Sequence, residues 1–370
     1  SLIPLTISGN AGAPGVTITY TDGTLKTATS QPDGSYSFTV PYGWSGSVTP
    51  SLTGYSFDPT DRSYTAISSN LTGQDFAAAL LSFTLSVTRS GTADVTITSS
   101  PAGIDCGNAA TSCSASFDYG TPVTLTATPA SDYFRLESWS GACSGSDPCS
   151  LIVSSDLSVS ANIETALFAD VPFHYTLTFG GTDYLLYPYI KALYDAGYTS
   201  GCSSDPLMFC PDNNLTRAEA AVFMLRAVFG VNYTPTIPDP PRFTDDDFSG
   251  VNSWAQAWVE SMATEGLSSG VTGTWYNAWA QLKRDEASVF VLRIKYGSSY
   301  DVGPADGTIF ADLTDTQYWG TAWVEQAYTE GLLPACGWDN GKPMICATVN
   351  VSRSLAAYMI VLAKEIELPE

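Results

Sequence analysis

Residues 215–226, LTRAEAAVFMLR, decide the fold of the C-terminal half of this chain. Thr216 is placed to accept a hydrogen bond from the backbone N–H of Glu219. The Glu219 carboxylate is placed to accept one in return from the backbone N–H of Thr216. This reciprocal pattern is a capping box, which begins helices. Behind the cap, apolar residues recur at helical spacing, at Ala218, Val222, Leu225 and Phe229. The stretch therefore predicts the start of an amphipathic helix.

The same stretch occurs twice more in the sequence. Residues 282–286 read LKRDE and residues 351–355 read VSRSL, and an apolar run follows each. The three arginines, Arg217, Arg284 and Arg353, lie 67 and 69 residues apart. A period of this size, present three times, predicts three supersecondary units packed together.

The three units share further features in the same order. Each opens with Phe-x-Asp, at residues 168–170, 243–245 and 310–312. A first helix is expected next, at residues 187–196, 254–265 and 319–330. These helices end at a glycine followed by a bulky residue, as in a left-handed C-terminal cap: Gly197, Gly266 and Gly331.

This ordered set of motifs resembles the S-layer homology (SLH) family over residues 166–370. The repeats fall at about 166–232, 241–298 and 308–370. The resemblance implies a pseudo-threefold helical bundle that binds cell-envelope polysaccharide in grooves between repeats.

The motif arginines are the candidate glycan-binding residues. The resemblance implies that Arg217 and Arg284 contact an acidic sugar substituent, whereas Leu355 replaces the motif glutamate in unit three, so that Arg353 is expected in a degenerate groove. A guanidinium at a helix N-terminus also favours an anionic or hydroxyl-rich ligand. The alternative is that the arginines only tie repeats together through carbonyls or carboxylates. The residues expected to support the motif are Thr216, Glu219 and Glu286.

Composition narrows the classes of function. The 370 residues include 15 Lys and Arg against 37 Asp and Glu, a formal net charge of −22. Such a charge disfavours binding to nucleic acid and to anionic membranes, and it also opposes an acidic glycan unless calcium offsets it. No apolar run is long enough to span a bilayer, so no membrane insertion is expected. No basic, apolar leader precedes Ser1, which is the pattern expected of a processed chain.

The eight cysteines form four close pairs in the sequence. An even number in local pairs indicates disulfides made outside the cytoplasm. Zinc binding is the alternative, but the spacings are not Cys-x-x-Cys and the sequence has a single histidine, His174, to which we assign no role. The expected pairs are Cys106 with Cys113, Cys143 with Cys149, Cys202 with Cys210, and Cys336 with Cys346.

Residues 1–79 alternate apolar and polar side chains between turns, as in residues 16–20 and 35–40, which predicts a β-sandwich. They resemble carboxypeptidase-regulatory-like domains, which implies an extracellular spacer or adhesive module. Residues 80–165 predict a second all-β unit and resemble InlB B-repeat-like bacterial surface domains. Its Trp139 is interpreted as a core or rim residue, with a sugar platform as the alternative. The predicted fold is thus two immunoglobulin-like β-sandwich domains followed by the SLH bundle.

Catalysis finds no support in the motifs. No His-x-x-x-His pair or phosphate loop occurs, so we expect no enzyme and no cofactor. Asp245, Asp246 and Asp247 are interpreted as a solvated loop, with a calcium site as the alternative. Four Asn-x-Ser/Thr sequons are candidate glycosylation sites: Asn70, Asn214, Asn232 and Asn350.

These features predict a non-catalytic, extracellular structural protein of the cell surface. Two functions are open. In the first, copies of the chain assemble into a surface layer, sheath or filament. In the second, a monomer anchors its β domains on envelope polysaccharide. For assembly, the apolar residues 1–7 are the candidate contact, added to a neighbour's sheet edge; the alternative is that they form the first strand of their own domain.

Overall fold

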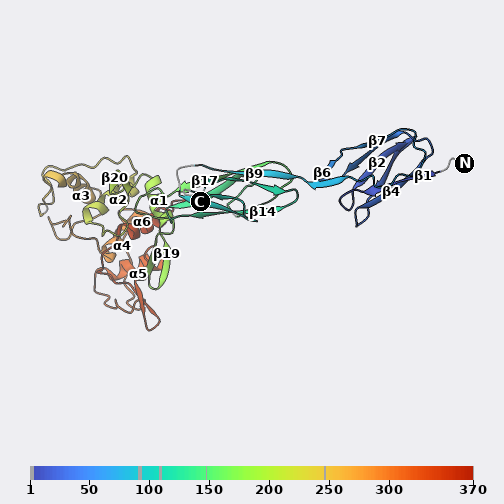
Figure 1. Cartoon of the computed structure of the whole chain (residues 1–370). Helices are drawn as coiled ribbons and strands as arrows, with labels where there is room; N and C mark the ends of the chain where they lie inside the picture. Colours follow the sequence, from blue (N-terminus) through green and yellow to red (C-terminus); the bar gives the residue numbers. More distant parts are fainter. Residues whose placement is uncertain (1–3, 91–93, 108–110, 147, 246, 370) are drawn as a thin grey trace. The chain divides into compact units, whose positions relative to one another are not determined.

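The structure is a computed structural model that describes residues 4–90, 94–107, 111–146, 148–245 and 247–369 (Figure 1). The chain divides into two compact units, residues 1–164 and 165–370. The first unit is built of β-strands, and the second contains the six α-helices of the described residues. None of the described helices combines the length and the apolar character needed to cross a membrane.

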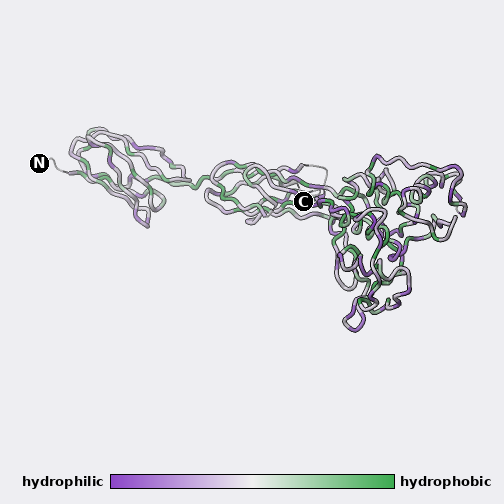
Figure 2. The backbone as a smooth tube through the Cα atoms, turned by 180° about the vertical axis from the view of Figure 1, so that it is seen from behind, coloured by the Kyte–Doolittle hydropathy of each residue, from purple (hydrophilic) through white to green (hydrophobic). Residues whose placement is uncertain are grey.

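The first part of the N-terminal unit is a β-sandwich, in line with the alternating pattern of its sequence. One four-stranded sheet has the order β3 (Thr24–Thr29), β2 (Thr17–Asp22), β5 (Gly46–Ser51), β7 (Arg62–Tyr64). Two further pairs are β1 (Pro4–Asn10) with β4 (Ser35–Pro41) and β6 (Tyr55–Asp58) with β8 (Ala77–Leu80). Short hydrophobic stretches interleave with hydrophilic ones along these strands (Figure 2).

Strand β1 lies inside its own domain. It pairs antiparallel with β4, and on its other side Ser8 N donates to Leu71 O and Leu71 N donates to Thr6 O, both at 2.9 Å. Leu5 and Ile7 are buried in the core of the sandwich. Residues 4–7 therefore begin a strand of their own domain, whereas residues 1–3 lie outside the described residues. Addition of residues 1–7 to a neighbouring copy stays a prediction.

The second part of the N-terminal unit packs two sheets. One has the order β12 (Thr111–Ser112), β11 (Asp105–Cys106), β10 (Val95–Ser100), β14 (Pro122–Pro129), β16 (Cys149–Ile152). The other has the order β13 (Ser114–Asp118), β9 (Ser82–Ser90), β17 (Leu157–Thr165), β15 (Phe134–Gly141). Trp139 is buried in the core between them, as its interpretation as a core residue predicts. It is therefore not placed to act as a sugar platform.

The C-terminal unit contains three pairs of helices. The first helix of each repeat is α1 (Tyr187–Asp195), α3 (Trp254–Thr264) or α5 (Thr321–Thr329). The arginine helices are α2 (Arg217–Phe229), α4 (Arg284–Tyr296) and α6 (Arg353–Lys364). Helix α4 contacts both α2 and α6, and each arginine helix also contacts the first helix of another repeat: α2 with α3, α4 with α5, and α6 with α1. The first helices of the three repeats begin and end within two residues of the predicted ranges.

Short elements complete the connections of this unit. The hairpins are β18 (Thr176–Phe179) with β19 (Thr182–Leu185), β20 (Ser203–Ser204) with β21 (Leu207–Met208), and β22 (Gly337–Asp339) with β23 (Lys342–Met344). A 3₁₀ turn, η1 (Gly250–Asn252), precedes α3.

Candidate functional site

The arginine helices begin with the caps that their sequences predict. In α2, Thr216 Oγ1 accepts a hydrogen bond from Glu219 N at 3.2 Å, and Glu219 Oε2 accepts one from Thr216 N at 2.9 Å. In α4 only the second half of the box is present, from Lys283 N to Glu286 at 3.0 Å, because an ammonium group cannot accept a hydrogen bond. In α6, Ser352 Oγ accepts from Leu355 N at 3.1 Å. Thr216, Glu219 and Glu286 thus take part in hydrogen bonds at the starts of their own helices.

The three motif segments meet in a closed cycle of backbone hydrogen bonds. Leu215 N donates to Val351 O at 2.9 Å, Val351 N to Leu282 O at 2.8 Å, and Leu282 N to Leu215 O at 2.8 Å. All three side chains are buried. Each repeat is thus hydrogen-bonded to both of the others, and the bond between Leu215 and Val351 joins the first repeat to the third.

The arginine side chains follow a cycle as well. Their residues are at most 5% exposed, and each Nε donates to a carbonyl oxygen in a loop of another repeat. The three bonds are Arg217 to Tyr276 at 2.9 Å, Arg284 to Ile345 at 2.7 Å, and Arg353 to Phe209 at 2.9 Å. The arginines therefore tie the repeats together, as the structural alternative predicts. Direct contact with a glycan stays a prediction.

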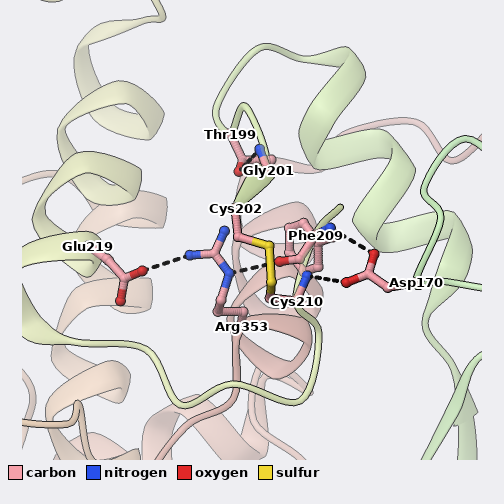
Figure 3. Close-up of a disulfide and its surroundings, with 8 residues drawn as sticks. All are labelled: Asp170, Thr199, Gly201, Cys202, Phe209, Cys210, Glu219 and Arg353. Carbon is pink, nitrogen blue, oxygen red and sulfur yellow. Dashed lines mark hydrogen bonds and ion pairs between the residues drawn. A yellow bond between two sulfur atoms is a disulfide. The ribbon is translucent and has the colours of Figure 1, made fainter. Parts of the chain in front are cut away.

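Two of the three arginines also bind the glutamate of a neighbouring motif. Arg217 pairs with Glu286, and Arg353 Nη1 donates to Glu219 Oε1 at 3.0 Å (Figure 3). Arg284 instead donates to the carbonyl oxygen of Pro334, because repeat three has Leu355 at the position of the glutamate. The replacement of the motif glutamate by Leu355 therefore leaves Arg284, and not Arg353, without a glutamate partner. Burial lowers the pKa of Arg284 to about 10, which the charge of Asp312 partly offsets.

The aspartate of each opening Phe-x-Asp shapes the loop that receives the arginine. Both oxygens of Asp170 accept backbone hydrogen bonds, from Phe209 N at 2.8 Å and Cys210 N at 2.6 Å (Figure 3). Asp245 and Asp312 do the same in their own repeats. The second residue of each of these turns has a positive φ: Cys210, Asn277 and Cys346. The aspartate thus stabilises the turn whose carbonyl binds the arginine, a role that the sequence alone did not reveal.

The four predicted disulfides are present: Cys106–Cys113, Cys143–Cys149, Cys202–Cys210 and Cys336–Cys346. Asp170 lies near the sulfurs of Cys202 and Cys210, and Asp312 near those of Cys336 and Cys346. Zinc requires thiolates, which bonded sulfurs do not provide. The last two disulfides therefore pin the arginine-binding loops of repeats one and three.

The suggested calcium ligands have other partners where they are described. Asp245 accepts two backbone N–H groups, and Asp247 accepts one from Ser249 at 2.9 Å. Asp246 lies outside the described residues. A calcium site here stays a prediction.

Two grooves of the same design lie between the repeats. Groove A lies between α2 and α3, and groove B between α4 and α5. Groove A is lined by residues 199–202, Glu219, Val222, Phe223, Arg226, Trp254, Trp258 and Arg353. Groove B is lined by residues 267–271, Arg217, Lys283, Asp285, Glu286, Val289, Phe290, Arg293, Tyr318, Trp319 and Trp323.

Corresponding side chains in the two grooves make the same contacts. Arg226 lies over the ring of Trp258 at 5.4 Å in groove A, and Arg293 lies over Trp323 at 5.3 Å in groove B. Each groove has one more cation than carboxylates among its lining residues. The rims carry exposed indoles, at Trp254 (44% exposed) and Trp319 (53%). The sequence analysis missed these residues, although Trp-x-x-x-Trp recurs at 254–258 and 319–323.

The third groove position is filled by the protein itself. Leu362 replaces the groove arginine and Tyr358 replaces the groove valine in α6. The Tyr358 ring packs against Tyr189 at 4.8 Å and Tyr184 at 5.6 Å. Two grooves, rather than three, therefore share the arginine–tryptophan design.

All four sequon asparagines are exposed, including Asn214 and Asn350 beside the starts of α2 and α6. The Asn70 side chain also accepts a hydrogen bond from Thr6 N at 2.9 Å. Attachment of glycans at these positions stays a prediction.

Comparisons with known proteins identify two domains. Residues 95–167 match the divergent InlB B-repeat domain and residues 186–221 match the S-layer homology domain. No curated protein matches the chain. The resemblance of residues 1–79 to carboxypeptidase-regulatory-like domains stays a prediction.

Several solved structures show partial likeness. The Bacillus anthracis TIE protein is 12% identical, over 45% of this chain and 34% of that chain, with a TM-score of 0.30. The streptococcal ancillary pilin is 11% identical, over 43% of this chain and 62% of that chain, with a TM-score of 0.21. The major pilin from Streptococcus pyogenes is 10% identical, over 45% of this chain and 99% of that chain, with a TM-score of 0.22. From the two matching domains, the chain is a cell-surface protein that carries a divergent InlB B-repeat domain and an S-layer homology domain.

Proposed function

We propose that this chain is a non-catalytic structural protein whose C-terminal unit anchors it to cell-envelope polysaccharide. In this proposal the unit is a pseudo-threefold SLH bundle of three repeats. The cyclic hydrogen bonds among Leu215, Leu282 and Val351 support the threefold arrangement. The two β domains are then the part that is held at the surface.

The observation that carries the proposal is the pair of matched grooves. Each offers an exposed indole, whose flat apolar face suits the C–H face of a sugar ring, beside cations and hydrogen-bonding groups. An excess of cations in each groove is notable on a chain of net charge −22. This local charge suits a polysaccharide with acidic substituents, which the rest of the surface would repel.

The buried arginines act indirectly in this proposal. Arg353 and Arg217 line grooves A and B, but their guanidinium groups already bind carbonyl and carboxylate oxygens. They fix the groove walls and add positive charge, whereas the exposed rim residues make the first contact with the glycan. Arg284 lies at the filled third position and supports the bundle only.

Binding should be tested on the groove rims rather than on the buried arginines. Trp254→Ala and Trp319→Ala remove exposed rings, and Trp338→Ala, 55% exposed and outside the linings of both grooves, is the matched control. The double variant should pellet with purified wall polysaccharide about 30-fold more weakly, as expected if each ring contributes about 1 kcal/mol to binding. The control should bind like the unchanged chain. A folded double variant that binds normally would refute the groove proposal.

Self-assembly into a surface layer, sheath or filament is the second candidate. The exposed edge strand β3, which pairs only with β2 among the described strands, is a surface that another copy could extend. Electron microscopy of the purified chain without wall material tests this candidate. Ordered polymers would favour assembly, and dispersed monomers that pellet with wall fragments would favour anchoring.

We propose that anchoring needs no cofactor. Pelleting with wall polysaccharide in the presence of a calcium chelator should match pelleting in added calcium. Loss of binding in the chelator would instead support the calcium alternative at residues 245–247.

A further inference from the structure

Groove B differs from groove A at three positions that contact one another. Where groove A has Ala218, Ser253 and Ala255, the corresponding residues of groove B are Asp285, Tyr318 and Gly320. A corner of small, uncharged side chains beside one groove is therefore a charged and phenolic corner in the other.

The new corner is built around one hydrogen bond. The Tyr318 hydroxyl donates to Oδ2 of Asp285, and Oδ1 of Asp285 accepts from Glu286 N at 2.7 Å. The Asp285 residue is 1% exposed, whereas Tyr318 is half-buried and lines the groove.

Gly320 makes room for this pair. A Cβ at this position would lie 2.9 Å from a ring carbon of Tyr318 and 3.0 Å from the Asp285 Cβ. Gly320 has ordinary helical backbone angles, so the glycine serves the close approach and not an unusual conformation. The three differences from groove A therefore form one structural unit.

This bond fixes the polarity that Tyr318 presents to the groove. A phenol has one proton to donate, and here the proton is directed at a carboxylate. Burial, and then the bond to Asp285, raise the pKa of Tyr318, so the hydroxyl keeps its proton at neutral pH. The Trp319 indole N–H interacts with the same phenol oxygen and lowers the pKa of Tyr318 slightly. What remains for a ligand is the other lone pair of the phenol oxygen, which only accepts a hydrogen bond.

We infer that Tyr318 is a specificity-determining residue of groove B, and that it selects a hydrogen-bond donor on the bound glycan. The donor is a sugar hydroxyl, near the acidic substituent that faces Lys283. Asp285 is the positioning residue that orients the phenol. This inference rests on the proposed function, and it predicts that grooves A and B prefer different positions on the polysaccharide.

The test isolates each groove in turn. Trp254→Ala disables groove A and Trp319→Ala disables groove B, and each background receives Tyr318→Phe, which keeps the ring and removes the acceptor. In the Trp254→Ala background, Tyr318→Phe should weaken binding of purified wall polysaccharide about fivefold, the value of one ordinary hydrogen bond. In the Trp319→Ala background it should change nothing.

A second variant separates orientation from packing. Asp285→Asn keeps the size of the side chain, but its amide can donate to the phenol oxygen, which turns the phenol proton toward the groove. It should weaken native polysaccharide in the Trp254→Ala background. It should also abolish the preference of groove B for native over O-methylated polysaccharide, which lacks hydroxyl donors. A general packing defect would lower binding of both polymers equally.

Two results are distinguishable. If the unchanged chain does not bind wall polysaccharide, the anchoring proposal fails and this inference fails with it. If the unchanged chain binds, and Tyr318→Phe in the Trp254→Ala background binds as tightly as its parent, only the inference about Tyr318 is overturned.

Discussion

Arg353 donates a hydrogen bond to Glu219 at 3.0 Å, although the two residues lie 134 positions apart in the chain. The other oxygen of Glu219 accepts from the backbone N–H of Thr216 at 2.9 Å. One carboxylate thus caps the first arginine helix and joins the third repeat to the first. Because the contact closes the cycle of repeats, we expect residues 165–370 to unfold cooperatively.

Truncation of the closing arginine should cost much of the stability of this unit. Arg353→Ala leaves the Phe209 carbonyl without this donor and Glu219 without this cation. We expect a loss of about 3 kcal/mol, as for removing a partly buried ion pair together with a buried hydrogen bond. Lys191→Ala, which removes an exposed pair with Asp195, is the control and should cost less than about 1 kcal/mol. Urea unfolding measures the free energy of unfolding of both variants. Equal losses would contradict a role of Arg353 in closing the cycle of repeats.

The opening aspartates should differ in importance. Asp170, Asp245 and Asp312 each accept two backbone hydrogen bonds, and removing such an acceptor costs about 1–3 kcal/mol. Disulfides also hold the loops of repeats one and three. Repeat two has no such disulfide, because Val271 stands at the position of Cys202 and Cys336. Asp245→Ala should therefore lower the melting temperature more than Asp170→Ala or Asp312→Ala. The reverse order would show that the disulfides do not share this task.

The disulfides should react unequally with a mild reductant. Cys202 is exposed, whereas the other bonded cysteines are buried or half-buried. Without reductant, the intact mass should be two hydrogens lower for each of the four disulfides. On brief reduction and alkylation, label should appear first at Cys202 and Cys210. Label that appears first at Cys106 or Cys149 would contradict the described burial.

Stability should fall at alkaline pH. Burial, with smaller contributions from Tyr189 and Tyr184, raises the pKa of Tyr358 to about 12, against about 10 in an unfolded chain. The pKa of Tyr358 is higher in the folded chain than in the unfolded chain. The contribution of protonated Tyr358 to the free energy of unfolding is therefore complete below about pH 10, and it is lost as the pH rises through about 12. Urea unfolding at about pH 9 and pH 11, with tyrosinate absorbance as a second signal, checks this. Tyr358→Phe should reduce the loss.

Deleting residues 1–7 should unfold the first β domain rather than release a folded monomer. The deletion removes Leu5 and Ile7 from the core and four of the seven residue pairs between β1 and β4. Calorimetry should show the loss of one transition. If the truncated chain melts like the full chain and only fails to assemble, the strand is exchanged between copies after all.

The sequence alone determined the local features of this protein. The cap of α2 depends on Thr216 and Glu219, three residues apart, and each disulfide joins cysteines six to ten residues apart. Strand alternation and helix-ending glycines are likewise read within one element. These features were predictable because the interacting groups are neighbours in the chain, so their geometry follows from the backbone.

Only the tertiary structure decided which residues of the three repeats contact one another. From the sequence, the loss of the motif glutamate at Leu355 was expected to affect the groove of Arg353. In the structure Arg353 still binds Glu219, and it is Arg284 that has no glutamate partner and donates to Pro334 O instead. The grooves were also invisible, because their walls combine the arginine helix of one repeat with the first helix of the next. The physical reason is that each arginine side chain binds a carbonyl oxygen of another repeat. Which repeat it reaches depends on packing between segments that are distant in the sequence.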